Sequence, residues 1–200
     1  MPISKSFLLC FGILFLSIFS LYPANRRYAD VFKPLDGRWQ GKFYVYSHKQ
    51  GQLPAPSQPK TITPETIKSL PLIEQTVIDV QQVYTSESPY FQRVVITDTY
   101  TDSTGTRRVE VSKGVNKVEK GKLLCIMDKP DEQVIHSGGF DGKDTITWER
   151  NIRNPLKIEF FKETVSKNRY TIIGWGYYGD DNPRLAPRTW FYAVYQRVRF

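Results

Sequence analysis

Arg150 occupies an otherwise apolar strand face, which is the first sign of a binding site in this sequence. In the stretch 146–152, the side chains of Ile146, Trp148 and Ile152 alternate with polar ones and share their face with Arg150. A buried guanidinium is costly unless it is paired, faces a wet cavity or meets an anion. We therefore predict a cavity for an amphiphile whose acidic head is held by Arg150. Alternatively, a β-bulge shifts the alternation, or the polar groups satisfy one another near one end of the fold.

Two further strand-like segments carry polar residues among apolar ones. Gln82 shares a face with the apolar positions 78, 80 and 84, and Asp98 shares one with positions 94 and 96 and with Tyr100. Such mixed faces suit a cavity in which a few polar groups orient a ligand. The predicted ligand-binding residues are Arg150, Trp148, Tyr100 and His136.

Residues that could perform catalysis are few. Cys125 lies in the apolar run 123–127 with no basic residue beside it, so a role as a small buried hydrophobe is expected. His48 lies in a polar turn and is expected to be solvated, whereas His136 lies in a strand and is expected to be hydrogen-bonded. The sequence has no hydrolase elbow, phosphate loop or metal-ligand spacing. It therefore predicts no catalytic residue, metal or cofactor, although enzyme activity is unsupported rather than excluded.

The elements that would hold these residues are strands. In the opening stretch, Trp39, Gly41, Phe43 and Val45 alternate with polar residues, which is the period-2 pattern of a half-buried strand. Nine similar segments follow, separated by turn residues, and no 20–50-residue repeat is present. The sequence predicts an all-β, antiparallel up-and-down barrel of eight to ten strands, with a sandwich as the alternative. The later segments are 75–84, 90–101, 106–118, 122–127, 133–138, 144–151, 157–164, 169–178 and 189–198.

One long irregular segment, roughly 47–72, interrupts this order. Its five prolines exclude a continuous central strand or helix. Within it, Thr63 is an N-cap candidate and Pro64 suits the first helical position, so one or two helical turns are expected over 63–70.

The pair Gly37-x-Trp39, at the start of the first strand, resembles the signature of the lipocalins and wider calycins. This resemblance implies that Trp39 plugs the closed end of a barrel, under an arginine from the end of the chain, either Arg197 or Arg199. It also implies that the proline-rich insertion forms a lid over the open end. In a haem-binding calycin His136 could serve as an axial ligand, against the hydrogen-bonded role expected above.

The N-terminal stretch has the pattern of a targeting segment. One lysine precedes the apolar run Phe7–Tyr22, which predicts a secretory signal over 1–24, cleaved near Ala24, or an uncleaved anchor. Residues 25–35 are expected to form a tether and residues 36–200 the barrel. We expect an exported protein, periplasmic or secreted, or a membrane-anchored one with the barrel outside the cytoplasm.

The charge distribution and the aromatic residues expected on the surface indicate which kinds of partner the protein binds. The formal net charge is +8, but the basic residues are scattered and form no run of four, which argues against a nucleic-acid partner. The predicted function is lipocalin-like binding of a small hydrophobic or amphiphilic molecule. The alternative is a non-enzymatic interaction protein or envelope-associated structural barrel with a filled core, using exposed Tyr44, Tyr46 and Phe161.

Overall fold

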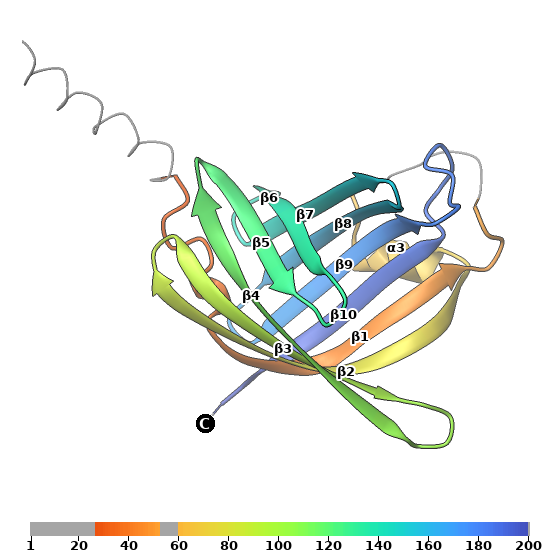
Figure 1. Ribbon diagram of the computed structural model, residues 1–200, viewed down its shortest axis with the longest axis horizontal. Coiled ribbons are helices and arrows are strands. Elements are labelled where there is room, and N and C mark those ends of the chain that lie inside the picture. The colour runs from red at the N-terminus through yellow and green to blue at the C-terminus, as the bar shows by residue number, and fades with distance from the viewer. Residues whose placement is uncertain (1–26, 53–59, 200) are drawn as a thin grey trace, which may run out of the picture.

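Ten strands make up about two thirds of the chain that the computed structural model describes, which is residues 27–52 and 60–199. Each strand pairs antiparallel with the next, and β1 pairs with β10, so the sheet closes into a barrel (Figure 1). The predicted up-and-down barrel is therefore confirmed, and the sandwich alternative is wrong. The strands are β1 (Gly37–His48), β2 (Leu72–Ser88), β3 (Phe91–Thr101), β4 (Arg107–Glu119), β5 (Lys122–Asp128), β6 (Gln133–Phe140), β7 (Thr145–Arg153), β8 (Leu156–Val165), β9 (Arg169–Tyr178) and β10 (Thr189–Val198).

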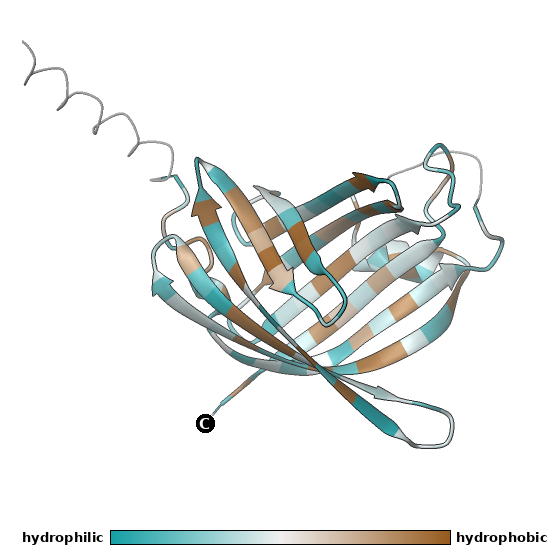
Figure 2. Ribbon diagram, in the orientation of Figure 1, coloured by the Kyte–Doolittle hydropathy of each residue, from teal (hydrophilic) through white to brown (hydrophobic). Residues whose placement is uncertain are grey.

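Alternate side chains of each strand point into the barrel, and Figure 2 shows the resulting bands of polar and apolar residues along the strands. On β9, Tyr170 and Ile172 face the interior, where they pack with Trp39 and Val80. The hydrophobic side chains on the outward face of β9 would be exposed to solvent if the barrel consisted of its strands alone. Here another segment of the chain packs over them.

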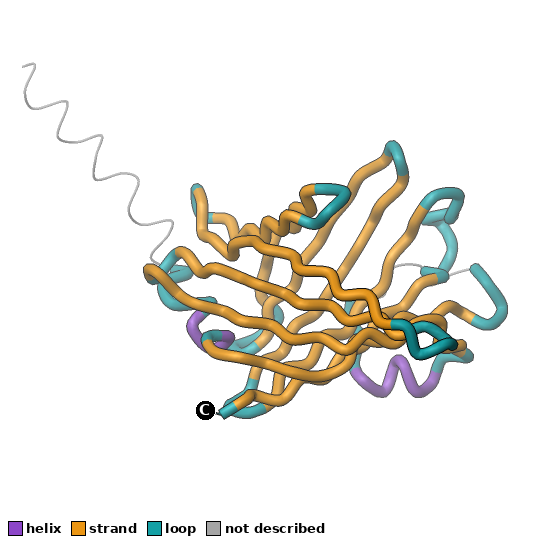
Figure 3. Tube along the Cα trace, turned by 60° about the horizontal axis from the view of Figure 1, so that its bottom comes forward, coloured by secondary structure: helices purple, strands orange, loops and turns teal. Residues whose placement is uncertain are grey.

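The outer cover comes from the insertion between β1 and β2. Its short helix α3 (Pro64–Ser69) begins with the predicted Thr63 cap, and Ile62 and Ile67 pack against outward-facing Ile173 and Trp175. Figure 3 shows this helix outside the ring of strands. The expectation of a lid over the open end is therefore wrong for residues 60–71, because their apolar side chains cover the outer wall. Residues 53–59 of the insertion lie outside the described residues.

Trp39 lies at the closed end of the barrel, as the Gly-x-Trp resemblance implied, with a 1% exposed side chain. Its indole Nε1 donates to the carbonyl of Leu35 at 2.7 Å, and the guanidinium carbon of Arg197 lies 4.2 Å from its ring centroid. Arg197 also donates to the carbonyls of Asp36 and Pro34. Gly37 has a φ of +114°, and a Cβ there would crowd Arg197, so this position requires glycine. The expected contact is confirmed, with Arg197 rather than Arg199.

The segment expected as a tether contributes to the same closed end. The short 3₁₀ helix η3 (Lys33–Leu35) follows Phe32, and the side chains of Phe32 and Leu35 are 2% and 1% exposed. Phe32 stacks on Trp148 with ring centroids 6.4 Å apart. These residues therefore cap the barrel rather than only linking it to the leader. The predicted leader itself lies within residues 1–26, outside the described residues. In the part of the chain that is described, no helix is both long and apolar enough to cross a membrane.

The ladder between β6 and β7 is short. Four residue pairs connect the two strands, from Ser137↔Glu149 to Phe140↔Ile146, all toward the closed end. Among the described residues, 133–136 and 150–153 form no such pairs with one another. The barrel wall near its open end is therefore held together at this seam by side chains.

Candidate functional site

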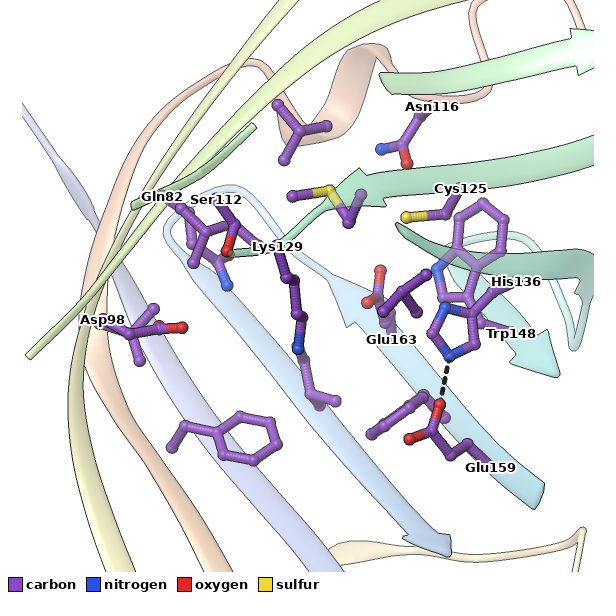
Figure 4. Close-up of a pocket in the computed structure, with 18 of the residues that line it drawn as sticks. Gln82, Asp98, Ser112, Asn116, Cys125, Lys129, His136, Trp148, Glu159 and Glu163 are labelled. Atoms are coloured by element: carbon purple, nitrogen blue, oxygen red, sulfur yellow. Dashed lines mark hydrogen bonds and ion pairs between the residues drawn. The ribbon is translucent and has the colours of Figure 1, made fainter. Parts of the chain in front are cut away.

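The interior of the barrel holds a cavity of about 270 Å³. Its wall is largely apolar, with contributions from residues such as Val80, Val94, Met127, Val134 and Ile172. Because Trp39 and the N-terminal segment fill the closed end, the cavity lies above a solid floor. Figure 4 shows polar side chains from several strands entering this space.

All four predicted ligand-binding residues line this cavity: Arg150, Trp148, Tyr100 and His136. Gln82 and Asp98, which were noted for their mixed faces, line it as well. No register shift is present at these positions, so the bulge alternative is wrong for them. The sequence pattern thus identified inward-facing polar residues, but it did not show what they contact.

Arg150 is paired within the protein. Its Nη2 lies 2.9 Å from Oε2 of Glu132, its Nη1 lies 3.7 Å from Oε2 of Glu159, and its side chain is 5% exposed. Lys157 also binds Glu132, at 2.7 Å. This is the alternative in which polar groups satisfy one another near the open end. Arg150 therefore pairs with Glu132 across the β6–β7 seam and lies close to Glu159 on the neighbouring strand β8, so it is not a free anion-binding group.

His136 joins the same network from β6. Its Nε2 and Oε2 of Glu159 are 2.9 Å apart, and the hydroxyl of Tyr178 donates to Oε1 of Glu159 at 2.8 Å. Burial alone would raise the pKa of Glu159, but His136, Tyr178 and nearby Arg150 outweigh it and lower that pKa. The hydrogen-bonded interpretation of His136 is therefore confirmed.

Glu132 has the most strongly depressed pKa in this network. Hydrogen bonds from Arg150 and Lys157 lower its pKa to about 2. Glu132 lies in the turn between β5 and β6, so it fastens that turn to β7 and β8. The network acts as a fixed rim of compensated charges at the mouth of the cavity.

Cys125 and His48, the two other residues considered for catalysis, occupy positions that suit a structural role. Cys125 faces the cavity, and burial raises the pKa of its thiol to about 12, which makes it a poor nucleophile. The expectation that His48 is solvated is wrong: it is 4% exposed at the end of β1, and its Nδ1 accepts a hydrogen bond from the amide of Gln50. Within the described ranges, no group of three His, Cys, Asp or Glu residues is placed to hold a metal ion.

Reasoning from the sequence missed several polar residues of the cavity, among them Glu132 and Glu159 of the charged network and Ser112. Glu163 shares the inward face of β8 with Phe161, so alternation along that strand could have identified it. Asn116 and Tyr170 stand at the closed-end parts of β4 and β9, and Lys129 follows β5. Figure 4 shows the Lys129 side chain reaching into the cavity, where its ammonium contacts no carboxylate of the described chain. Nothing in the local sequence marks Lys129 as inward-facing.

Fold and site together define a class: a ten-stranded antiparallel barrel, closed at one end by a tryptophan under an arginine, with a mostly apolar internal cavity. This architecture is consistent with a calycin-like barrel. No family model and no curated protein matches the sequence. Among solved structures, the chain is similar to the crystal structure of Rv2717c from M. tuberculosis, with a TM-score of 0.51 and 14% sequence identity. The match covers 90% of this chain and 99% of that one, and it supports the shared fold.

Proposed function

We propose that the protein is a lipocalin-like binding protein for a small hydrophobic or amphiphilic molecule, which it holds inside the barrel. The observation that carries this proposal is the cavity of about 270 Å³ above a floor closed by Trp39. Small-molecule sites typically measure about 300–1,000 Å³ and combine apolar walls with a few polar groups. A cavity close to the lower end of this range suits a ligand up to the size of a small drug.

Ligand binding can be tested on the purified protein in two steps. Native mass spectrometry would reveal a small molecule that co-purifies with the folded chain. Titration with a neutral solvatochromic dye such as Nile red would then show a saturable site, because the dye fluoresces when it leaves water for an apolar cavity. A protein that carries no small molecule and gives no saturable dye signal would contradict the proposal.

The proposed location rests on the leader. An apolar run of sixteen residues after a basic start supports export, with the barrel outside the cytoplasm as a periplasmic, secreted or membrane-tethered domain. Fusing residues 1–35 to a reporter that is active only outside the cytoplasm would test this. Reporter activity confined to the cytoplasm would contradict it, and N-terminal sequencing would separate a cleaved signal from an anchor.

The alternative is an interaction protein, and one observation favours it. Tyr44 stacks with Tyr46 and with Tyr192 on the outer wall of β1 and β10, with ring centroids 6.0 and 6.4 Å apart. Phe161, however, was wrongly expected on this surface: it faces the cavity and packs near Phe191. The filled core that this alternative requires also differs from the observed cavity. We therefore place ligand binding first.

A further inference from the structure

Two buried polar atoms on the cavity wall lack hydrogen-bond partners. Asn116 is 3% exposed and Tyr170 is fully buried, yet Oδ1 of Asn116 and the hydroxyl of Tyr170 have no partner at hydrogen-bonding distance and angle among the described residues. The Tyr170 hydroxyl lies near the carboxyl group of Glu163 but outside this geometry. Both residues line the cavity, near its closed end. Buried polar groups are nearly always satisfied by protein, water or ligand. These two atoms therefore point to something that occupies the floor of the cavity.

The orientation of the Asn116 amide follows from a chain of hydrogen bonds beneath the floor. Nε2 of Gln92 donates to the carbonyl of Phe32 at 2.8 Å and to Oδ1 of Asp36 at 2.9 Å. Because these two partners only accept, Gln92 must present its oxygen on the other side, where Nδ2 of Asn116 donates to it at 3.0 Å. Asn116 therefore keeps its carbonyl oxygen free, as an acceptor.

Glu163 is a third acceptor in the same part of the cavity. Its carboxyl group lies by Trp148 and Tyr170, and no cationic side chain of the described residues forms an ion pair with it. Of the basic side chains that line the cavity, Arg150 is bound to Glu132 and His136 to Glu159. Lys129 also lines the cavity but forms no ion pair with Glu163 or with any other carboxylate of the described residues. Burial raises the pKa of Glu163 to about 7, partly countered by Trp148 and Tyr170.

We propose that the floor of the cavity is a subsite for the protonated amine of a small aliphatic amine, with the carboxylate of Glu163, Oδ1 of Asn116 and the hydroxyl oxygen of Tyr170 as its acceptors. This proposal rests on the proposed function and names the chemical class of the ligand. An ammonium group has three N–H donors, and the floor offers three acceptors. A ligand carboxylate at the same place would instead be repelled by ionised Glu163 and would meet Oδ1 of Asn116, which only accepts. The aliphatic chain would lie along the apolar wall.

Binding at this subsite would be coupled to release of a proton, because only ionised Glu163 attracts an ammonium. The titratable groups nearest Glu163 are Tyr84 on β2, Cys125 on β5, Tyr170 on β9 and Tyr195 on β10. Burial raises the pKa of each of these four, so they stay protonated at neutral pH. His136 also faces the cavity, and variants of Glu163 therefore have to show which group carries the pH dependence.

The test compares three probes with the same eight-carbon chain: octylamine, octanol and octanoate. Each displaces Nile red from the purified protein at pH 8.0 and at pH 5.5. We expect octylamine to bind at least tenfold more tightly than octanol at pH 8.0. At pH 5.5 its affinity should fall by about 30-fold, because a carboxyl group with a pKa of about 7 is then mostly protonated. Octanol should bind equally at both pH values.

Two cavity variants and one surface control complete the design. Glu163→Gln keeps the shape of the side chain and should remove both the preference for the amine and its pH dependence, with octanol binding retained. Asn116→Leu should weaken octylamine but leave the pH dependence in place. Glu149→Gln, an exposed carboxylate on the outer face of β7, should behave like the unmodified protein.

The outcomes separate the two proposals. If Nile red binds to no saturable site, the proposed function itself fails. If octanol or octanoate binds as tightly as octylamine, the cavity binds ligands but its floor is not an amine subsite. Tighter binding of octanoate would assign the polar contact to Lys129 instead. A pH dependence that persists in Glu163→Gln would also overturn the inference.

Discussion

Arg150 on β7 and Glu132 in the β5–β6 turn face each other across the seam where the ladder between β6 and β7 ends, with Nη2 and Oε2 2.9 Å apart. The second guanidinium nitrogen lies 3.4 Å from Oε1, so the contact is nearly bidentate. Bidentate pairs fix geometry as well as charge. This pair replaces the missing backbone pairing near the mouth of the barrel.

Replacing Arg150 with Met should therefore destabilise the fold. If Arg150 were unpaired, the loss of its charge would leave stability unchanged or raise it, but here Met would leave Glu132 and Glu159 without their shared cation. We expect a loss of about 1–3 kcal/mol in the free energy of unfolding, below the cost of breaking a fully buried pair because Glu132 is 35% exposed. Urea denaturation at pH 7 measures this loss in the free energy of unfolding. Asp79→Asn, which breaks the exposed Lys42–Asp79 pair, is the control and should cost clearly less, because solvent screens an exposed pair. Equal effects of the two changes would contradict this role for the seam.

Glu163→Gln should stabilise the protein at alkaline pH and not at acidic pH. The folded chain raises the pKa of Glu163 from an ordinary 4.5 to about 7. As pH rises from 4.5 to 7, the unfolded chain loses this proton while the folded chain keeps it, so stability falls over that range. Removing the group should add up to roughly 3 kcal/mol at pH 8 and nothing at pH 4. Denaturation curves at both pH values test this, and an equal gain at pH 4 would refute it.

Arg197→Met should weaken the closed end. The guanidinium lies over Trp39 and donates to the carbonyls of Pro34, Asp36 and Lys167, so its loss should cost about 1–3 kcal/mol. Arg199→Met is the matched control, because Arg199 is exposed at the same end of the chain and should change stability by less than about 0.5 kcal/mol. Thermal denaturation of both variants makes the comparison. A larger effect of Arg199→Met would contradict the assignment.

The strands were predictable because their signals are local. Period-2 alternation and turn residues lie within each segment, and the Gly37-x-Trp39 motif identified the closed end. The partner of Trp39 was narrowed to two arginines, since the first and last strands of a closed barrel are neighbours. The structure selects Arg197.

The contacts of the cavity were not predictable in the same way. Arg150 is paired with a glutamate from a turn 18 residues earlier, and the alternation of β7 carries no information about that turn. On β8 both faces are covered, because Phe160 packs beneath the insertion and Phe161 packs in the barrel. The alternation of residues along β8 therefore could not show whether Phe160 or Phe161 faces the cavity. For the same reason it could not show which carboxylates of this strand face inward.

Cys125 should react slowly with thiol reagents in the folded protein. Burial raises its pKa to about 12, so its thiolate fraction at pH 8 is roughly a thousandth of that of an ordinary cysteine. Alkylation by iodoacetamide, followed by mass spectrometry, should be at least a hundredfold slower in the native protein than in urea. Comparable rates would show that the cavity wall opens readily.

Filling the cavity should abolish ligand binding without harm to the barrel. Ile96 faces the cavity near the middle of β3, and the next residue, Thr97, faces outward. Ile96→Trp places a large ring in the space of about 270 Å³, whereas Thr97→Trp adds the same ring to the outer surface. We expect Ile96→Trp to weaken Nile red binding at least tenfold and Thr97→Trp to leave it within twofold. Circular dichroism should show the same strand content in both variants. If Ile96→Trp folds normally and still binds the dye with unchanged affinity, the dye lies outside the barrel, and the aromatic surface around Tyr44 becomes the better candidate.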